Sequence, residues 1–205
     1  MSQTQLRPDH EVIASLITTQ ARVLDVGCGD GRLLGWLRAH KQVDGRGIEI
    51  DQQQVQRALS QGIAVIQGDV ASDLPHYPAQ SYDYVILSQA LQAMADPVAV
   101  LEQLVRIGKQ AIVSVPNFGY WKNRLYLSVL GRMPVTKTLS FQWYDTPNIH
   151  FCTITDFVVL AEQLNIAVED RIMVDAHGGK TKFSGQGRLA NLFGEQGVFL
   201  LKKRA

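Results

Sequence analysis

The sequence predicts an α/β domain built on a doubly wound, seven-stranded, mostly parallel sheet. The first half of the chain alternates short runs rich in Val, Ile and Leu with segments of helical periodicity, which is typical of strands joined by crossover helices. Two further strand-like runs follow near the C-terminus and bring the expected strands to seven. The length of 205 residues fits one domain of this class.

The alternating part of the chain extends from residue 9 to residue 115. Asp9 is expected to cap the first helix, because the apolar residues after it fall on one face. The run 82–87 is almost continuously apolar, as expected of a strand covered on both faces. Pro97 and Gly108 mark the start and the end of a helix. The expected strands are 22–26, 46–50, 63–67, 82–87 and 111–115, and the expected helices are 9–18, 32–40, 52–61 and 97–107.

The regular alternation stops at Pro116. Residues 116–151 contain one expected helix, at 123–130, and are rich in aromatic and basic side chains. We interpret this stretch as a lid or interaction insertion within a single domain that covers residues 1–205. It can form a wall of the substrate pocket, a surface for a protein partner, or a lid that packs on its own core. Its aromatic residues are Phe118, Tyr120, Trp121, Phe141, Trp143 and Tyr144, and its bases are Lys122, Arg124, Arg132 and Lys137.

A capping box begins the last part of the chain. Thr153 and Asp156 have the spacing of this motif and are expected to begin a helix that ends near residue 164. The runs 167–174 and 198–202 predict the two late strands.

Charge and composition narrow the classes of function. The net charge is +1, which argues against a dedicated nucleic-acid-binding protein. No apolar run reaches the roughly 20 residues needed to span a bilayer, and the polar N-terminus shows no signal peptide, so we expect a cytoplasmic protein without a membrane partner. Cys28 and Cys152 exclude a disulfide scaffold, and their spacing indicates no metal site.

The glycine-rich run 23–31 contains the strongest signal for a ligand. Gly27, Gly29 and Gly31 follow a strand that contains Asp25, and a helix begins directly after them. Glycines allow a sharp turn and a close approach of ligand to backbone, and the helix start offers free N–H groups. A dinucleotide fingerprint would need glycine where Arg32 stands, and the acidic residue before the loop disfavours a pyrophosphate. The pattern therefore favours a ligand with positive charge, and it resembles the signature loop of class I S-adenosylmethionine (SAM) methyltransferases.

Further polar residues end the neighbouring strands. Glu49, at the end of the second strand, is expected to accept hydrogen bonds from the two ribose hydroxyls. Asp51 has either this role or that of a helix cap. Asp69, after the third strand, is expected near the adenine, as the resemblance implies, and the alternative is an Asp of the loop turn. Ser88 is expected at the methionyl end of the cofactor.

Candidate catalytic residues are few. In-line methyl transfer depends on holding two reactants together, and a base is needed only when the acceptor carries a proton. His150 is the best single candidate for a base, although an isolated histidine is more often structural. Asn117, after the fifth strand, is a second candidate for the site. No G-x-S-x-G elbow is present, so acyl transfer by a serine nucleophile is not expected.

Six runs resemble a narrower family, the MetW family of methionine biosynthesis proteins. The specific ones are PNFGYW at 116–121 and WYDTPNIH at 143–150, and the others are VLDVGCGDG at 23–31, GIEID at 47–51, LSQAL at 87–91 and GRMP at 131–134. The resemblance implies a Rossmann-like class I methyltransferase fold, with SAM or S-adenosylhomocysteine (SAH) as cofactor. It also implies a partnership with homoserine O-acyltransferase (MetX), whose activity such proteins are thought to support or modulate.

Three functions follow from these observations. The leading one is a SAM-binding partner of the acyltransferase that does not itself catalyse methyl transfer. The second is an active methyltransferase on an unidentified small acceptor. The third, a nucleotide-binding fold without affinity for SAM, is disfavoured by Asp25 and Glu49.

Overall fold

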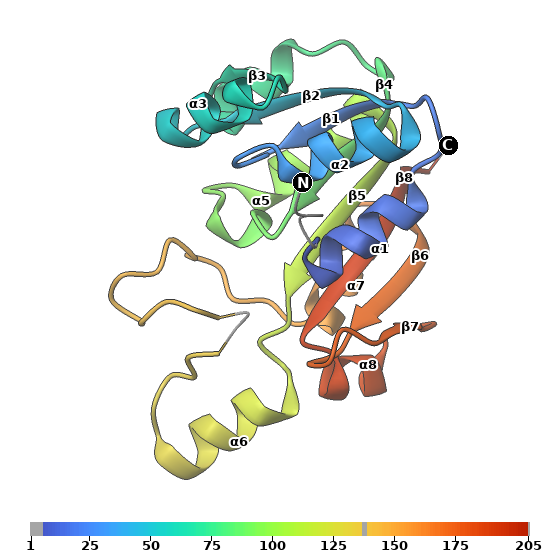
Figure 1. Cartoon of the computed structure of the whole chain (residues 1–205). Helices are drawn as coiled ribbons and strands as arrows, with labels where there is room; N and C mark the ends of the chain where they lie inside the picture. Colours follow the sequence, from blue (N-terminus) through green and yellow to red (C-terminus); the bar gives the residue numbers. More distant parts are fainter. Residues whose placement is uncertain (1–5, 137–138, 205) are drawn as a thin grey trace.

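One mixed sheet with helices on both faces forms the body of the molecule (Figure 1). The computed structural model describes residues 6–136 and 139–204, so Lys137 lies outside the described residues. The strands are β1 (Arg22–Val26), β2 (Asp44–Glu49), β3 (Ala64–Gln67), β4 (Tyr82–Ser88), β5 (Gly108–Pro116), β6 (Ile166–Val174), β7 (Lys180–Lys182) and β8 (Gln196–Lys203). The helices are α1 (Pro8–Leu16), α2 (Arg32–Lys41), α3 (Gln52–Ser60), α4 (Val70–Asp73), α5 (Pro97–Ile107), α6 (Trp121–Leu130), α7 (Ile154–Gln163) and α8 (Arg188–Phe193), with 3₁₀ turns η1 (Leu74–His76) and η2 (Leu91–Ala93).

The strand order is β3-β2-β1-β4-β5-β8-β6-β7. The strands β1 to β5 pair in parallel, whereas β8, β6 and β7 are joined by antiparallel pairs. This confirms the predicted α/β class with a mostly parallel sheet. The predicted count of seven strands is one too low, because β7 has only three residues, all exposed, and therefore lacks a hydrophobic pattern.

Helices cover the two faces of the sheet in separate groups. One apolar layer joins the sheet to α1, α2 and α3, and the other joins it to α5 and α7. Side chains alternate between the faces along each strand. Leu24 and Val26 belong to the layer of α5 and α7, so Asp25 between them lies on the face covered by α1, α2 and α3. The same alternation places Ser88 and Ser114, near the carboxyl ends of β4 and β5, on the α1 face.

The local signals for helix ends are mostly confirmed. Thr153 and Asp156 form the predicted capping box, with the Asp156 N–H 3.2 Å from Thr153 Oγ1. Pro97 begins α5, as predicted. The prediction that Asp9 caps the first helix is wrong, because α1 begins at Pro8, with Arg7 at the cap position. The side chain of Asp9 is completely buried and turned toward the sheet instead.

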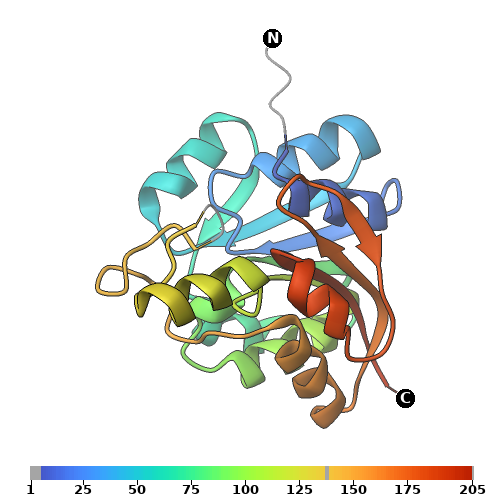
Figure 2. The same cartoon turned by 90° about the horizontal axis from the view of Figure 1, so that it is seen from below.

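The segment after β5 lies apart from the layered body. Figures 1 and 2 show α6 and the loop that follows it beyond the carboxyl end of β5. The helix α6 begins two residues earlier than predicted and ends at Gly131, whose φ of 60° is the left-handed conformation of a helix C-terminus. Only Asn123 of the ten residues of α6 is buried. Among the described residues, no helix combines the length and the apolar character that crossing a bilayer requires.

Candidate functional site

The glycine loop connects β1 to α2 at the carboxyl edge of the parallel strands. Gly27, Gly29 and Gly31 have φ values of 71°, 56° and 74°, which residues with a side chain rarely adopt. The Gly27 N–H donates to the carbonyl of Ile48 at 2.8 Å and ties the loop to β2. A Cβ added to Gly29 would meet no atom within 4 Å. The backbone of the loop is therefore open to a ligand at Gly29.

Gly31 has a different role in the same loop. A Cβ added there would lie 3.1 Å from Ala58 Cβ and 3.2 Å from two carbons of Ile63. The third glycine therefore allows α2 to pack against the α3–β3 connection, and its role is packing.

Asp25 is a buried carboxyl group without a partner. The residue is 2% exposed, and its Oδ1 has no hydrogen-bond partner in the part of the chain that the structure describes. The pKa of Asp25 is raised to about 7, chiefly by burial; the Arg7 guanidinium opposes the rise, and the carboxylates of Glu49 and Asp9 add to it. An unpartnered buried acid is costly to the fold, and a cationic ligand would relieve that cost.

Glu49 connects the end of β2 to the glycine loop. Its Oε2 accepts a hydrogen bond from the Gly29 N–H at 2.8 Å, and its Oε1 accepts one from the Asp51 N–H at 3.0 Å. Each carboxylate oxygen has a second acceptor position, so both oxygens retain capacity for a ligand hydroxyl. Asp51 caps α3, with its Oδ1 2.7 Å from the Gln53 N–H. The helix-cap alternative for Asp51 is therefore the one that the structure shows.

Asp69 is exposed and caps the short helix α4. Its Oδ1 accepts from the Ala71 N–H at 3.3 Å. This is the turn role that the sequence left open for Asp69. A contact with adenine stays a prediction.

Ser88 belongs to a hydrogen-bond network around Asp9 that the sequence did not predict. The hydroxyls of Ser88 and Ser114 donate to Asp9 Oδ2 at 2.8 and 3.1 Å. The Nε and Nη2 atoms of Arg7 lie 3.2 and 3.1 Å from the two carboxylate oxygens of Asp9. Although burial alone would raise the pKa of Asp9, the charges of Arg7 and His10 and the hydrogen bonds from Ser88 and Arg7 hold it below its usual range. The only signal in the sequence is the presence of Ser88 and Ser114 near the ends of two apolar strands.

The two catalytic candidates, His150 and Asn117, differ in exposure and in hydrogen bonding. The side chain of His150 is exposed, and its backbone N–H donates to the Gln92 carbonyl at 3.0 Å. Asn117 is 1% exposed, and its amide makes four hydrogen bonds to the backbone, at 2.7 to 3.2 Å. These bonds use the full capacity of the Asn117 amide, so this side chain is structural. A catalytic role for His150 stays a prediction.

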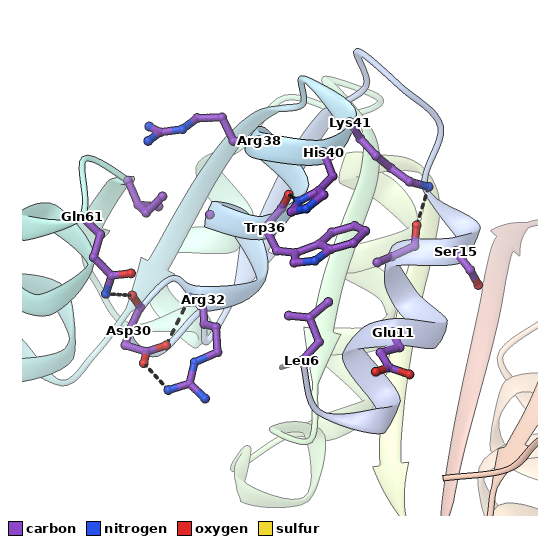
Figure 3. Close-up of a pocket in the computed structure, with 13 residues that line it drawn as sticks. Leu6, Glu11, Ser15, Asp30, Arg32, Trp36, Arg38, His40, Lys41 and Gln61 are labelled. Carbon is purple, nitrogen blue, oxygen red and sulfur yellow. Dashed lines mark hydrogen bonds and ion pairs between the residues drawn. The ribbon is translucent and has the colours of Figure 1, made fainter. Parts of the chain in front are cut away.

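A wide open groove of about 1180 Å³ lies beside the glycine loop, between α1 and α2 (Figure 3). Trp36 stacks on His40 within it, with ring centroids 4.2 Å apart. Asp30 of the loop and Arg32, the first residue of α2, form an ion pair at its edge, at 3.2 Å. The groove is not lined by the predicted cofactor residues Asp25, Glu49, Asp69 or Ser88, so it does not coincide with the strand ends where the cofactor is expected. No group of three or more potential metal ligands occurs among the described residues.

The layered sheet with a glycine loop after β1 defines the class of protein, a Rossmann-like domain of the class I methyltransferase type. A SAM-dependent methyltransferase of Thermotoga maritima, described as a possible histamine N-methyltransferase, matches with a TM-score of 0.69 at 17% identity. The match covers 96% of this chain and 88% of that chain. A SAM-dependent methyltransferase of Mesorhizobium loti matches with a TM-score of 0.67 at 16% identity over 96% of this chain and 98% of that one.

The fold alone does not determine the reaction. The structure of SpnF, described as a [4+2]-cyclase, matches with a TM-score of 0.65 at 16% identity and covers 96% of this chain and 80% of that chain.

The chain belongs to the MetW family of methionine biosynthesis proteins, whose model matches residues 7–201. This confirms the resemblance seen in the sequence. A curated relative, the bifunctional methionine biosynthesis protein MetXA/MetW of Rhodopirellula baltica, is 35% identical over an alignment of 188 residues that covers 87% of this chain. The chain spans about 30% of the length of that relative.

Proposed function

We propose that this protein binds SAM or SAH at the strand ends beside Asp25, Gly29 and Glu49, and acts as a partner of a MetX-type homoserine O-acyltransferase. The partnership with the acyltransferase is supported by the fused relative, whose name joins MetXA and MetW in one chain. Because that relative combines both names in one chain, a partnership between separate MetX and MetW chains is the simplest counterpart here. A cytoplasmic location fits this role.

The chemistry of the strand ends supports a cationic adenosyl ligand. SAM carries an ammonium and a sulfonium, and the acidic groups Asp25 and Glu49 lie at the ends of β1 and β2, next to the glycine loop. The open backbone at Gly29 allows close approach, and the free lone pairs of Glu49 suit two ribose hydroxyls. We include Gly27, Gly31, Asp69 and Ser88 in the proposed site as residues that shape the loop and the strand ends around it. When bound, SAM would supply an activated methyl group or serve as a regulatory ligand.

Residues 116–151 are proposed as the surface that contacts the acyltransferase. Trp143 and Tyr144 are 72% and 71% exposed, and much of α6 is also exposed and apolar. Aromatic residues and arginines are enriched in the cores of protein interfaces. No acidic residue occurs between Glu102 and Asp145, so the surface is basic and apolar. It fits an acyltransferase surface with acidic residues around an apolar centre.

A regulatory role follows if SAM changes the affinity between the two proteins. SAM would then bind the free protein and the complex with different affinities, which is the requirement for coupling. SAM, a product of later steps, would thereby change the rate of homoserine acylation, an early step of the same biosynthesis.

The test is to purify this protein with the homoserine acyltransferase of the same organism and to measure acylation with and without SAM. We expect acylation to depend on this protein and to change with SAM. The variant Glu49→Ala serves as the control, because it should keep the dependence on the protein and lose the response to SAM. Acylation that is the same with and without this protein would reject the partnership.

A second candidate function, methyl transfer to a small acceptor, is favoured by the methyltransferase neighbours of the fold. In that case His150 is the candidate base. Transfer of a labelled methyl group to an acceptor, reduced in the variant His150→Ala, would support this function over the first.

A further inference from the structure

The helix α6 is apolar around most of its circumference, yet the body of the molecule covers little of it. Leu125 and Val129 lie one turn apart along one side of the helix, and Tyr126 and Leu130 lie one turn apart along another. These four side chains are 39–69% exposed, and Asn123 is the only buried residue of α6. A helix with apolar residues on several sides is typical of a buried position. The exposed helix α6 therefore lacks the cover that its sequence fits.

The short helix α8 exposes a second apolar stripe at the same end of the molecule. Figures 1 and 2 show α8 beside the start of α6, and both helices lie at the bottom of the view in Figure 1. Leu189 and Phe193 are one helical turn apart and are 73% and 51% exposed. Because α8 lies outside the segment 116–151, these two residues form an apolar surface that the proposed function does not yet use.

Hydrogen bonds of Asn117 hold the start of α6 against α8. Asn117 Nδ2 donates to the carbonyls of Asn191 and Gly194 at 2.8 and 2.7 Å. Asn117 Oδ1 accepts from the Gly119 N–H at 3.0 Å. A Cβ added to Gly119 would lie 2.9 Å from Asn191 Oδ1, so the turn before α6 packs directly on α8. The two helices are therefore joined at a defined position and can present their apolar side chains to one partner together.

The charges around these apolar residues have one sign. Neither 121–130 nor 188–193 contains an acidic residue, and the exposed residues Lys122, Arg124 and Arg188 are basic. Within the described part of the chain, none of these three bases forms an ion pair. Two copies of such a surface would repel each other, so the charges disfavour self-association and favour a partner with acidic groups around an apolar centre.

We propose that α6 and α8 form one two-helix docking surface, in which α6 lies in an apolar groove of the homoserine acyltransferase and acidic residues of that groove face the bases. A groove covers several sides of an inserted helix, which matches the distribution of apolar residues around α6. A flat partner surface would leave one of these sides exposed. This inference rests on the proposed partnership, and it adds α8 to the surface and specifies the shape and the charge of the partner.

The experiment measures association with the acyltransferase, by surface plasmon resonance, for paired charge substitutions on both helices. The variants are Val129→Asp and Val129→Arg on α6, and Leu189→Asp and Leu189→Arg on α8. We expect the substitutions to arginine to weaken association about tenfold, because an apolar contact is lost. The substitutions to aspartate should weaken it about 100-fold, because the new charge also meets acidic groups of the partner.

A matched control and a folding control accompany these variants. Leu59→Asp changes an exposed leucine of α3, outside both helices, and should leave the association unchanged. Because Val129 and Leu189 are 69% and 73% exposed, all five variants should keep the circular dichroism spectrum and the melting temperature of the wild type. A weaker association in a variant with these unchanged properties then reports a lost contact.

The outcomes distinguish this inference from the proposed function. If the wild type does not associate with the acyltransferase, the partnership fails and this inference fails with it. If the wild type associates but the Leu189 variants bind equally well, or if aspartate and arginine have equal effects, the docking surface is overturned and the partnership stands. If sedimentation shows a wild-type dimer that Leu189→Asp dissociates, with binding to the acyltransferase unchanged, the surface belongs to a second copy and the inference is likewise overturned.

Discussion

The carboxyl edge of β1, β2 and β4 and the segment 116–151 lie near the same end of the molecule but are built in opposite ways. Beside the strand ends, Asp9 and Ser114 are buried and joined with Ser88 in one hydrogen-bond network. In the segment after β5, the large aromatic side chains Trp143 and Tyr144 are exposed. The first region has the organisation of a small-ligand site, and the second has the organisation of a surface for a macromolecule.

This difference indicates that the two regions can be impaired separately. Changes at the strand ends should affect binding of the adenosyl ligand, and changes in 116–151 should affect association with the acyltransferase. A change in one region that also alters the other function directly would show that they form one site, with the segment acting as a wall of the ligand pocket.

The largest effect is expected at Asp25. Asp25→Asn removes the only charge proposed to face the ligand ammonium from β1, and we expect SAM affinity to fall about 100-fold by calorimetry. The substitution also has a signature in stability. The pKa of Asp25 in the folded protein is about 7, above its unfolded value, so its contribution to stability is present at low pH and is lost as pH rises toward and through 7.

The stability of Asp25→Asn should therefore depend less on pH. The difference in melting temperature between pH 5 and pH 8, measured without ligand, is expected to be smaller in the variant than in the wild type. Identical pH dependence in the two proteins would contradict the assignment of a protonated, unpartnered Asp25.

Glu49→Ala is expected to have the next largest effect. Removing this carboxylate eliminates the proposed ribose contacts and the hydrogen bond to the Gly29 N–H. We expect SAM affinity to fall roughly 10- to 100-fold, with an unchanged circular dichroism spectrum. Glu49→Gln should lose less, because the amide oxygen can still accept from the loop. An unchanged dissociation constant in Glu49→Ala would reject the ribose role.

The variant Trp143→Ala tests the role of the segment 116–151. If the exposed indole inserts into the acyltransferase, its truncation should weaken association about tenfold or more, as for an interface residue of large contribution. Surface plasmon resonance with the immobilised acyltransferase would measure this effect. SAM affinity should stay within about twofold of the wild type, and a loss of SAM binding instead would place Trp143 in the ligand pocket. Trp36→Ala, in the groove beside α1, is a matched aromatic control.

The change of SAH affinity with pH is expected to be smaller than the effects of the substitutions above, but it reports directly on the charge state of Asp25. Arg7 and Asp9 on the α1 side and Glu49 from β2 are the charged groups that influence Asp25. Because the ligand ammonium favours the ionised form of Asp25, affinity for SAH should rise with pH through about 7. We expect a gain of about tenfold from pH 6 to pH 8, with proton release near pH 7. The variant Asp25→Asn should show neither the gain in affinity nor the proton release. A wild-type affinity independent of pH would contradict the role of Asp25.

The smallest effect is expected from the exposed bases of the segment 116–151. Arg132→Glu should weaken association with the acyltransferase severalfold at low salt, and the effect should shrink as ionic strength rises. Arg124 is a poorer choice, because its Nε donates to the Gly119 carbonyl and the substitution would disturb the start of α6. If Arg132→Glu changes neither affinity nor its salt dependence, the charge of this surface is unrelated to the partner.

The sequence predicted those elements whose residues carry a local signal. The strand at 22–26 was placed at its observed bounds because its apolar run ends at a glycine. The strand β2 begins two residues before its predicted start, since Asp44 and Gly45 carry no strand pattern and are recruited by pairing with β1. The helix α8 and the strand β7 were missed because they are short and lie in a polar loop.

The glycine loop and the acidic residue at the end of β2 were visible because ligand sites at this edge need residues of those types close in sequence. The network around Asp9 was not visible in the sequence, since its hydrogen bonds to Ser88 and Ser114 join residues 79 and 105 positions apart. A capping role is the ordinary inference for an aspartate at a helix start. Only the packing of α1 on the sheet reveals that Asp9 orients Arg7.

The Cys28 thiol lies inside the glycine loop, where its reactivity toward a bound ligand matters. A thiolate beside a sulfonium would invite alkylation of the protein by its own ligand. Burial raises the pKa of the Cys28 thiol well above its usual range, and the carboxylates of Asp25 and Glu49 reinforce this shift. A Cβ on Gly47 would collide with the Cys28 sulfur, so the absence of a side chain at Gly47 provides the recess in which the unreactive thiol is stored. Cys28 in the glycine loop and Gly47 in β2 would thus keep a nucleophile unreactive beside the proposed sulfonium ligand.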